Sequence, residues 1–390
     1  MKLFRICYYT ILTGFFFAGI ITGRREIFLL FFIMFFLLFA SLMLVLWTAL
    51  SFSFVQELSE KTAVKGGTVN LKINIYNDKP FPFTLMKIYV QTVKYNSDTV
   101  LSFNLSPKSR ISFDVPVYAA YRGVYDIGMA KLEINDIFGL MQIKFDMRKL
   151  SYYRMRTLTV YPKLVELPFL PARLSDAKLA GGAAMRVSEE GEAFSALRDY
   201  RHGDTAKRIH WKASAGKREL LVKNYDTPAE NGVMIAVDLQ ANEEEGENLL
   251  IWADIACECA AMIAKYSTWA GYNVLLIDSA PASRAVEAGS RQDFAVIYDR
   301  LAVMPFGKGA DFAGKIKAEF EKRQSIEAVY IVSSRHEGIC AAVNEMLHKG
   351  CRVKCLMPNA GRDAVQAAMS AMPGASCTAV EFGSDIASWV

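Results

Sequence analysis

The chain has 390 residues, of which 52% are hydrophobic, and its formal net charge is +5. Since globular domains usually contain about 100 to 200 residues, this length predicts two or three domains. The small net charge does not favour a nucleic-acid-binding protein. The seven cysteines include no CxxC pair of the kind that binds zinc, so we expect small buried thiols in a reducing compartment.

Two apolar segments open the chain, residues 6–22 and residues 27–50. The second contains no charged residue and, at about 1.5 Å per residue, is long enough for a hydrocarbon core of about 30 Å. The first is about 25 Å long on the same measure. Because only four residues separate them, we expect a two-helix transmembrane hairpin over residues 1–50. A signal peptide is the alternative for the first segment, although its cleavage pattern is poor.

The basic residues around the hairpin predict its orientation. Those on the side of the two chain ends are Lys2, Arg5, Lys61 and Lys65, whereas the turn carries Arg24 and Arg25. Loops rich in Lys and Arg remain in the cytoplasm. We therefore expect a two-pass protein of the inner (cytoplasmic) membrane whose soluble domains are cytoplasmic.

From residue 68 the hydrophobic pattern has a period of two. The segment TVNLKINIYN alternates apolar and polar side chains, and VLSFNL, RISFDVPV, AKLEIND and MQIKF repeat the alternation between turn signals. This pattern predicts an all-β sandwich over residues 51–161. Residues 162–193, with their prolines, a Gly-Gly pair and acidic side chains, are predicted to be a linker or a long covering loop.

Residues 227–390 alternate between apolar runs and segments of helical period. GVMIAVDL is a continuous apolar run, typical of a parallel strand that is buried on both faces. NVLLID, AVYIVSS, RVKCLM and CTAVEF are further predicted strands, with helical segments between them. This order predicts an open, mostly parallel α/β sheet.

A basic segment, RDYRHGDTAKRIHWKASAGKR, covers residues 198–218. It holds seven basic and two acidic residues, so its charge of +5 equals that of the whole chain. Asp204 is predicted to cap a helix that ends near Gly216. The following residues, ELLVKNY, are predicted to form a strand that returns the chain to a sheet.

Three interpretations of the basic segment stay open. Its arginines suit carboxylates or phosphates, and His210 titrates near neutral pH, which together favour an anion site. Alternatively, the segment is a solvated basic face with Trp211 as a core anchor, or it pairs with the acidic residues of the linker. Anionic lipid is a further ligand for a basic patch near a membrane. The candidate polar contact site consists of Arg198, Arg201, Asp204, Arg208, His210 and Trp211.

The segment FSALRDYRHGDTAKRIHWKASAGKRELLVKNYD, residues 194–226, closely resembles the signature of a bacterial family catalogued as domain of unknown function 58. The matching residues are Arg198, Tyr200, Gly203, Asp204, Ile209, His210, Trp211, Ala215 and Leu220. Upstream, YRGVYDIGMAKLEINDIFGL is similar to the RGxY and DPFGL motifs of that family, with Ile137 in place of the usual proline. We therefore treat residues 194–226 as a separate signature segment.

The resemblance implies a membrane hairpin, an immunoglobulin-like β-sandwich and a von Willebrand factor A-like α/β domain over residues 227–390. In such domains an Asp-x-Ser-x-Ser loop binds a divalent cation. The corresponding positions here are Asp238, Gln240 and Asn242, which lack both serines. We therefore expect no metal at this loop, and no cofactor.

Members of the family commonly occur beside MoxR-type AAA+ ATPases. The resemblance thus implies a membrane-anchored, non-catalytic adaptor or scaffold for such an ATPase, or for another acidic protein partner, in protein assembly or activation. The competing hypothesis is a sensor or an enzyme with an anionic small-ligand site at the basic segment. Catalysis is the less favoured of the two, because the chain contains no GxSxG, P-loop or GxGxxG motif, and no catalytic residue is assigned.

Overall fold

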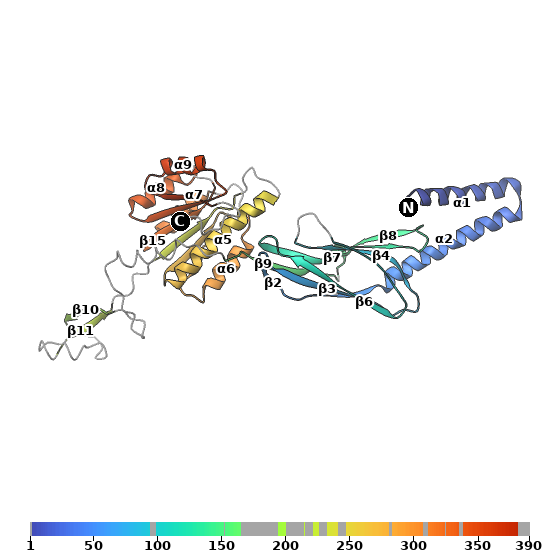
Figure 1. Cartoon of the computed structure of the whole chain (residues 1–390), viewed down its shortest axis with the longest axis horizontal. Coiled ribbons are helices and arrows are strands. Elements are labelled where there is room, and N and C mark those ends of the chain that lie inside the picture. The colour runs from blue at the N-terminus through green and yellow to red at the C-terminus, as the bar shows by residue number, and fades with distance from the viewer. Residues whose placement is uncertain are drawn as a thin grey trace. The chain divides into compact units, whose positions relative to one another are not determined.

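The computed structural model describes residues 2–93, 99–151, 153–164, 194–199, 214, 221–225, 232–240, 247–280, 283–306, 311–323, 325–334 and 338–380. The chain divides into two compact units, Met1–Tyr161 and Pro162–Val390 (Figure 1). The first unit contains two apolar helices and two β-sheets, and the second contains an α/β sheet.

The first two helices, α1 (Lys2–Thr22) and α2 (Arg25–Ser51), form an antiparallel hairpin. Gly23 makes the tight turn possible, since its φ of 65° lies in the left-handed region that glycine adopts without strain. Phe16 and Phe31 pack across the hairpin with their ring centroids 5.2 Å apart. Both helices are long and apolar enough to cross a membrane, as the sequence predicted.

Two β-sheets follow the hairpin. The smaller has the order β1-β3-β6 and consists of β1 (Ser53–Leu58), β3 (Thr68–Asn77) and β6 (Ser109–Tyr118), all antiparallel. The larger has the order β2-β9-β7-β4-β5: β2 (Thr62–Val64), β9 (Arg156–Tyr161), β7 (Gly123–Asn135), β4 (Phe83–Gln91) and β5 (Thr99–Leu105). A further strand, β8 (Gln142–Asp146), pairs with β7 and leads into the 3-10 helix η1 (Met147–Lys149).

The two sheets share one apolar core. On β3 the predicted alternation is confirmed, since Val69, Leu71, Ile73 and Ile75 are all buried. They pack in one cluster with side chains of β4, β7 and β9 and with Val45 of α2. The first unit is therefore a sandwich of two sheets onto which the second hairpin helix packs.

The second unit contains a six-stranded sheet of order β14-β13-β12-β15-β16-β17. Its strands are β12 (Gly232–Val237), β13 (Asn273–Asp278), β14 (Val286–Ala288), β15 (Ile326–Val332), β16 (Arg352–Pro358) and β17 (Ser376–Val380). Every pairing is parallel except that of β14 with β13. The mostly parallel sheet agrees with the sequence prediction, although the short antiparallel β14 was not expected.

Helices cover both faces of this sheet. The helices α5 (Glu247–Trp269) and α6 (Phe294–Val303) pack on one face, and α7 (Phe312–Glu321), α8 (Cys340–His348) and α9 (Arg362–Ala371) on the other. Along β12, Val233 and Ile235 join the first core, whereas Met234 and Ala236 join the second. Burial on both faces explains why this strand is a continuous apolar run.

A separate two-stranded ribbon precedes the large sheet. It pairs β10 (Phe194–Asp199) with β11 (Leu221–Tyr225) in antiparallel orientation. The strand predicted after Gly216 is thus present. Its partner among the described strands is β10, whereas the sequence predicted a return to a sheet without naming the partner strand.

The expectation of buried thiols is confirmed for four of the seven cysteines, Cys257, Cys259, Cys355 and Cys377. Cys340 and Cys351 are partly buried, and Cys7 is exposed on α1. Burial raises the pKa of Cys259 to about 12, with smaller contributions from its acidic neighbours. Cys7 is exposed because it lies on an outward face of an apolar helix, where a thiol is as acceptable as a methyl group.

Candidate functional site

The basic segment lies between the two strands of the β10–β11 ribbon. Asp199 stands opposite Leu221 in the register, and Arg198 stands opposite Val222. The ribbon thus pairs the residues that flank the stretch 200–220. This stretch contains six basic residues and two acidic ones, so the two strands flank a cationic part of the sequence.

The predicted contact residues fall mostly outside the described part of the chain. Arg198 lies on β10. The others, Arg201, Asp204, Arg208, His210 and Trp211, lie outside the described residues, as does the helix expected after Asp204 apart from Ser214, which is helical and buried. The assignment of these six residues to one contact site stays a prediction.

A second group of polar residues gathers at the carboxyl end of the parallel sheet. The central strand β12 has β13 on one side and β15 on the other, so the strand order reverses there. In open α/β sheets this point is where ligands usually bind. Asp238 follows β12, Asp278 ends β13 and Ser333 follows β15, and all three are buried.

The carboxylate of Asp238 is engaged by its neighbours. The hydroxyl of Ser333 donates to Oδ2 at 3.0 Å, and the backbone N–H of Gln240 donates to Oδ1 at 3.0 Å. Gln240 thus contributes its backbone to a turn around Asp238, and Asn242 lies outside the described residues. Asp238 is thus a buried polar residue that fixes the end of β12.

The described part of this loop differs from the metal-binding pattern in its partners and in its residues. Both carboxylate oxygens of Asp238 already accept hydrogen bonds, and Gln240 stands where the metal-binding loop needs a serine hydroxyl. Within the described residues, no group of three His, Cys, Asp or Glu side chains could hold a metal. That the whole loop binds no metal stays a prediction.

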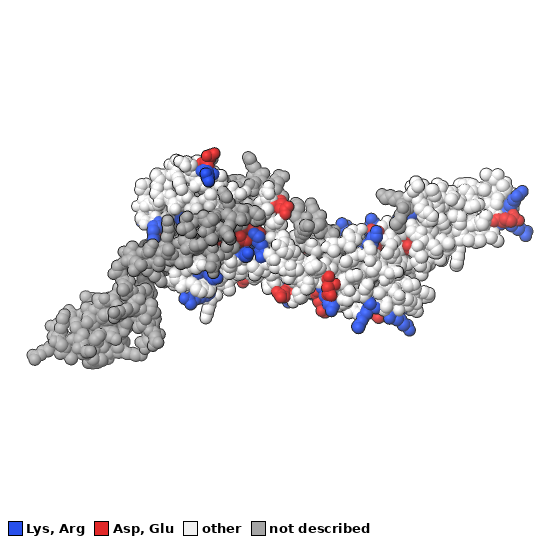
Figure 2. All heavy atoms as spheres, viewed as in Figure 1, with Lys and Arg blue, Asp and Glu red and all other residues white. Residues whose placement is uncertain are grey.

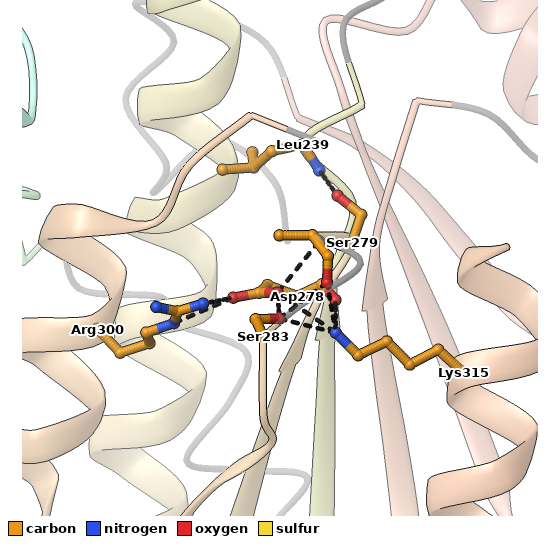
Figure 3. A network of polar contacts seen from close by, with 7 residues as sticks. Leu239, Asp278, Ser279, Ser283, Arg300 and Lys315 are labelled. Carbon is orange, nitrogen blue, oxygen red and sulfur yellow. Dashed lines mark hydrogen bonds and ion pairs between the residues drawn. The ribbon is translucent and has the colours of Figure 1, made fainter. Parts of the chain in front are cut away.

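Asp278 is the centre of a charged network that the sequence analysis did not identify (Figure 3). Arg300 of α6 donates to its Oδ2 through both Nε, at 3.0 Å, and Nη2. Lys315 of α7 places Nζ 3.5 Å from Oδ1 and 2.8 Å from the backbone oxygens of Asp278 and Ala280. Ser283 donates to Oδ1 and accepts from Lys315.

This network joins three layers of the α/β unit. Arg300 comes from a helix on one face of the sheet and Lys315 from a helix on the other face. Ser279, the next residue after Asp278, accepts from the backbone N–H of Leu239 at 2.9 Å and so ties the end of β13 to the end of β12. The polar groups at this edge are therefore structural supports that fix the strand ends and the helices above them.

In the first unit, the DIFGL motif forms the loop on which the hairpin docks. The buried carboxylate of Asp136 accepts from the Ser41 hydroxyl of α2 and from the backbone N–H of Met141 at 3.1 Å. Arg5 of α1 donates to the backbone oxygen of Gly139 at 2.7 Å and to Gln142 at 3.1 Å. Both helices of the hairpin are therefore fastened to one loop of the sandwich.

Next to this loop, Glu133 is buried among hydrogen-bond donors. Tyr89 and Asn135 each donate to its carboxylate at 3.2 Å, and Lys144 lies 3.5 Å away. Burial alone would raise the pKa of Glu133, but the hydrogen bonds from Asn135, Gln142 and Tyr89 and the charge of Lys144 together lower it. Glu133 is therefore ionised in the neutral pH range.

Comparison with known proteins gives one informative match. The model of a family described as "Protein of unknown function DUF58" matches residues 196–349. No curated protein matches the chain.

Solved structures resemble the chain only weakly. A β-glucosidase from Listeria innocua has a TM-score of 0.16 and 10% identity, over 28% of this chain and 16% of that chain. The β-glucosidase EmGH1 from Erythrobacter marinus has a TM-score of 0.17 and 7% identity, over 28% of this chain and 15% of that chain. The match thus spans less than a fifth of these proteins, and similarity at this level indicates neither fold nor activity.

Proposed function

Because residues 196–349 belong to the DUF58 family of proteins of unknown function, we propose that the protein is a membrane-anchored, non-catalytic adaptor whose signature segment docks an acidic protein partner. The observation that carries this proposal is the β10–β11 ribbon, whose pairing of Asp199 with Leu221 brings together the two residues that flank the positively charged stretch 200–220. A segment whose two ends are fixed loses less conformational entropy on binding than a free segment does.

The α/β unit supports the adaptor over an enzyme. At the sheet edge where ligands usually bind, Asp238 and Asp278 hold their hydrogen-bond and ion-pair partners within the protein itself. A general base needs a free position for the substrate's proton. In the adaptor, these carboxylates instead hold the strand ends and the helices of the α/β unit in place.

The proposed architecture follows the family. The two-sheet sandwich is compatible with an immunoglobulin-like domain, and the doubly wound sheet with a von Willebrand factor A-like domain. The apolar hairpin anchors the protein in the inner membrane, and the basic residues at its two chain ends favour cytoplasmic soluble domains. The proposed partner is a MoxR-type AAA+ ATPase, with which such proteins would act in protein assembly or activation.

The test is crosslinking in intact membranes, followed by purification of the full-length protein and mass spectrometry. The test variant is Arg201→Glu/Arg208→Glu. The matched control is Arg284→Glu/Arg362→Glu, which makes the same change in charge at two exposed positions of the second unit. We expect an AAA+ ATPase with the wild type and the control, and its loss with the test variant.

Two results would contradict the proposal. Equal recovery of the ATPase with both variants would show that the basic segment is not the docking surface. If no protein partner is captured by the wild type, the adaptor is wrong, and a phosphate-bearing or carboxylate-bearing small ligand becomes the better hypothesis for the signature segment.

A further inference from the structure

The contacts between the hairpin and the sandwich determine how much of each helix extends beyond the sandwich. The described contacts of α1 with the sandwich end at Tyr9, whose hydroxyl donates to the backbone oxygen of Leu140 at 3.3 Å. Those of α2 reach Ser41, whose hydroxyl donates to Asp136. From these two residues to the turn at Gly23, the hairpin extends away from the sandwich.

This free part is too short to cross a bilayer. From residue 10 to residue 22, α1 measures about 20 Å, and from residue 26 to residue 40, α2 measures about 22 Å, at about 1.5 Å per residue. The hydrocarbon core is about 30 Å thick. A hairpin that crosses the membrane must therefore use the turns that pack on the sandwich, and this brings the end of the sandwich to the depth of the lipid.

The charged residues of the hairpin agree with this placement. The face of the hairpin shown in Figure 2 gathers its charged side chains at the turn. Arg5 lies on α1 about 27 Å from Gly23, at about 1.5 Å per residue. Its guanidinium is bonded to the backbone oxygen of Gly139 and to Gln142. Arg5 therefore marks the second membrane boundary, at the level of the DIFGL loop.

Exposed apolar side chains lie beside the hairpin near this level. Ile137 is 65% exposed and Phe138 is 48% exposed on the DIFGL loop, while Phe81, which precedes β4, is 52% exposed and Leu85 on β4 is 42% exposed. Phe81 packs edge-on against Trp47 of α2, with a centroid distance of 5.9 Å. Tryptophan is enriched at membrane interfaces, where its ring is half in lipid and half in water.

The DIFGL loop and the start of β4 also line an open groove of about 630 Å³. Its apolar lining comes from this loop, from β4 and from α1, and includes the side chains of Phe4, Phe83, Leu85, Ile137 and Phe138. The groove thus continues the apolar surface of the first hairpin helix onto the sandwich. In water this surface would be costly, since soluble proteins rarely expose a continuous apolar patch next to a long apolar helix.

We infer that this end of the sandwich is immersed in the membrane interface, where Phe81, Leu85, Ile137 and Phe138, here called the lipid collar, contact the acyl chains of the bilayer. The inference rests on the proposed membrane anchoring of the hairpin. It makes the hairpin and the sandwich one rigid membrane-embedded body.

The test places the photoreactive residue p-benzoylphenylalanine at one position at a time in the full-length protein, in vesicles of phosphatidylethanolamine and phosphatidylglycerol. The test position is Phe138. Phe36, which is 70% exposed in the middle of α2, reports on the membrane insertion of the hairpin, and Tyr118, which is 59% exposed at the end of β6 opposite the hairpin, is the negative control. Lipid adducts are counted by mass spectrometry after illumination.

We expect lipid adducts at Phe138 in a yield within about threefold of that at Phe36, and at least about tenfold above Tyr118, because only the first two lie in lipid. Adducts at Phe36 but none at Phe138 would overturn the lipid collar and leave the membrane anchor intact. Adducts at neither position would overturn both. Crosslinks from Phe138 to a second copy of the protein, or equal lipid labelling at Tyr118, would also overturn the collar.

Discussion

Two buried carboxylates, Asp278 in the α/β unit and Asp136 in the sandwich unit, are stabilised in different ways. In the α/β unit, Asp278 is neutralised by two cations, Arg300 and Lys315. In the sandwich unit, Asp136 is held by the Ser41 hydroxyl and a backbone N–H. The first arrangement fixes helices from both faces of a sheet to a strand end, and the second fastens an apolar helix to a loop. Each of these two carboxylates uses the donors that its surroundings supply, since a second charge beside an apolar helix would be costly to bury.

The largest loss of stability is expected when the charged network around Asp278 is broken. In Asp278→Ala, Arg300 and Lys315 lose their shared counter-charge while most of their surface stays buried. We expect a loss of about 3 kcal/mol in the free energy of unfolding of this unit, at the low end for a broken buried ion pair because both cations reach solvent. Thermal unfolding of the full-length protein in detergent measures it, with the exposed Asp363→Ala as control. Equal melting temperatures for the two variants would contradict the structural role of the network.

A smaller loss of stability is expected at Asp136, which holds the hairpin to the sandwich. Asp136→Ala removes the acceptor for the Ser41 hydroxyl and for the backbone N–H of Met141. Leaving buried donors without a partner costs about 2 kcal/mol. Asp126→Ala, at an exposed position of β7, the strand that leads into the loop of Asp136, is the matched control. The account fails here if the sandwich in the Asp136 variant melts at the temperature of the Asp126 variant.

The sandwich is also expected to be sensitive to acid through Glu133. Because its pKa is lowered in the folded state, Glu133 contributes stability above its ordinary unfolded value of about 4.3. That contribution is lost as the pH falls through the folded-state pKa. We expect Glu133→Gln to be less stable than the wild type at neutral pH and to lose less stability below about pH 4.3. Parallel acid titrations of the melting temperature measure this, and identical slopes would contradict it.

The smallest effect on stability is expected in the signature segment. If Arg208 contacts a partner, Arg208→Ala should change the free energy of unfolding by less than about 0.5 kcal/mol, as surface substitutions usually do. A loss comparable to that of Asp278→Ala would instead favour an internal ion pair between this segment and the acidic residues of the linker. The free energy of unfolding, measured in the absence of any partner, distinguishes a partner contact from an internal ion pair.

The sequence predicted those elements whose pattern is local. The uncharged segment 27–50 required a long apolar helix, and the continuous apolar run at β12 required a strand buried on both faces. The alternation on β3 predicted which side chains enter the core. The short strand β14 was missed because three residues carry no periodic signal.

The polar contacts could not be predicted in the same way. Arg300 and Lys315 lie 22 and 37 residues from Asp278, and Ser41 lies 95 residues from Asp136. No local sequence pattern predicts contacts between residues this far apart in the chain, because such contacts depend on how the sheets and helices pack. An acidic residue at the end of a parallel strand was the available signal for Asp278. For the signature segment, composition predicted a charged contact site, and the β10–β11 ribbon adds that its ends meet.

The proposed function depends on the binding of an acidic protein partner by the basic segment. The most direct measurement is the dissociation constant between the full-length protein in nanodiscs and the AAA+ ATPase captured by crosslinking, at low and at physiological salt. The account predicts that salt and Arg201→Glu/Arg208→Glu each weaken binding by about tenfold or more, since charged contacts at this segment are screened by salt and reversed by the variant. A dissociation constant unchanged by both would contradict it.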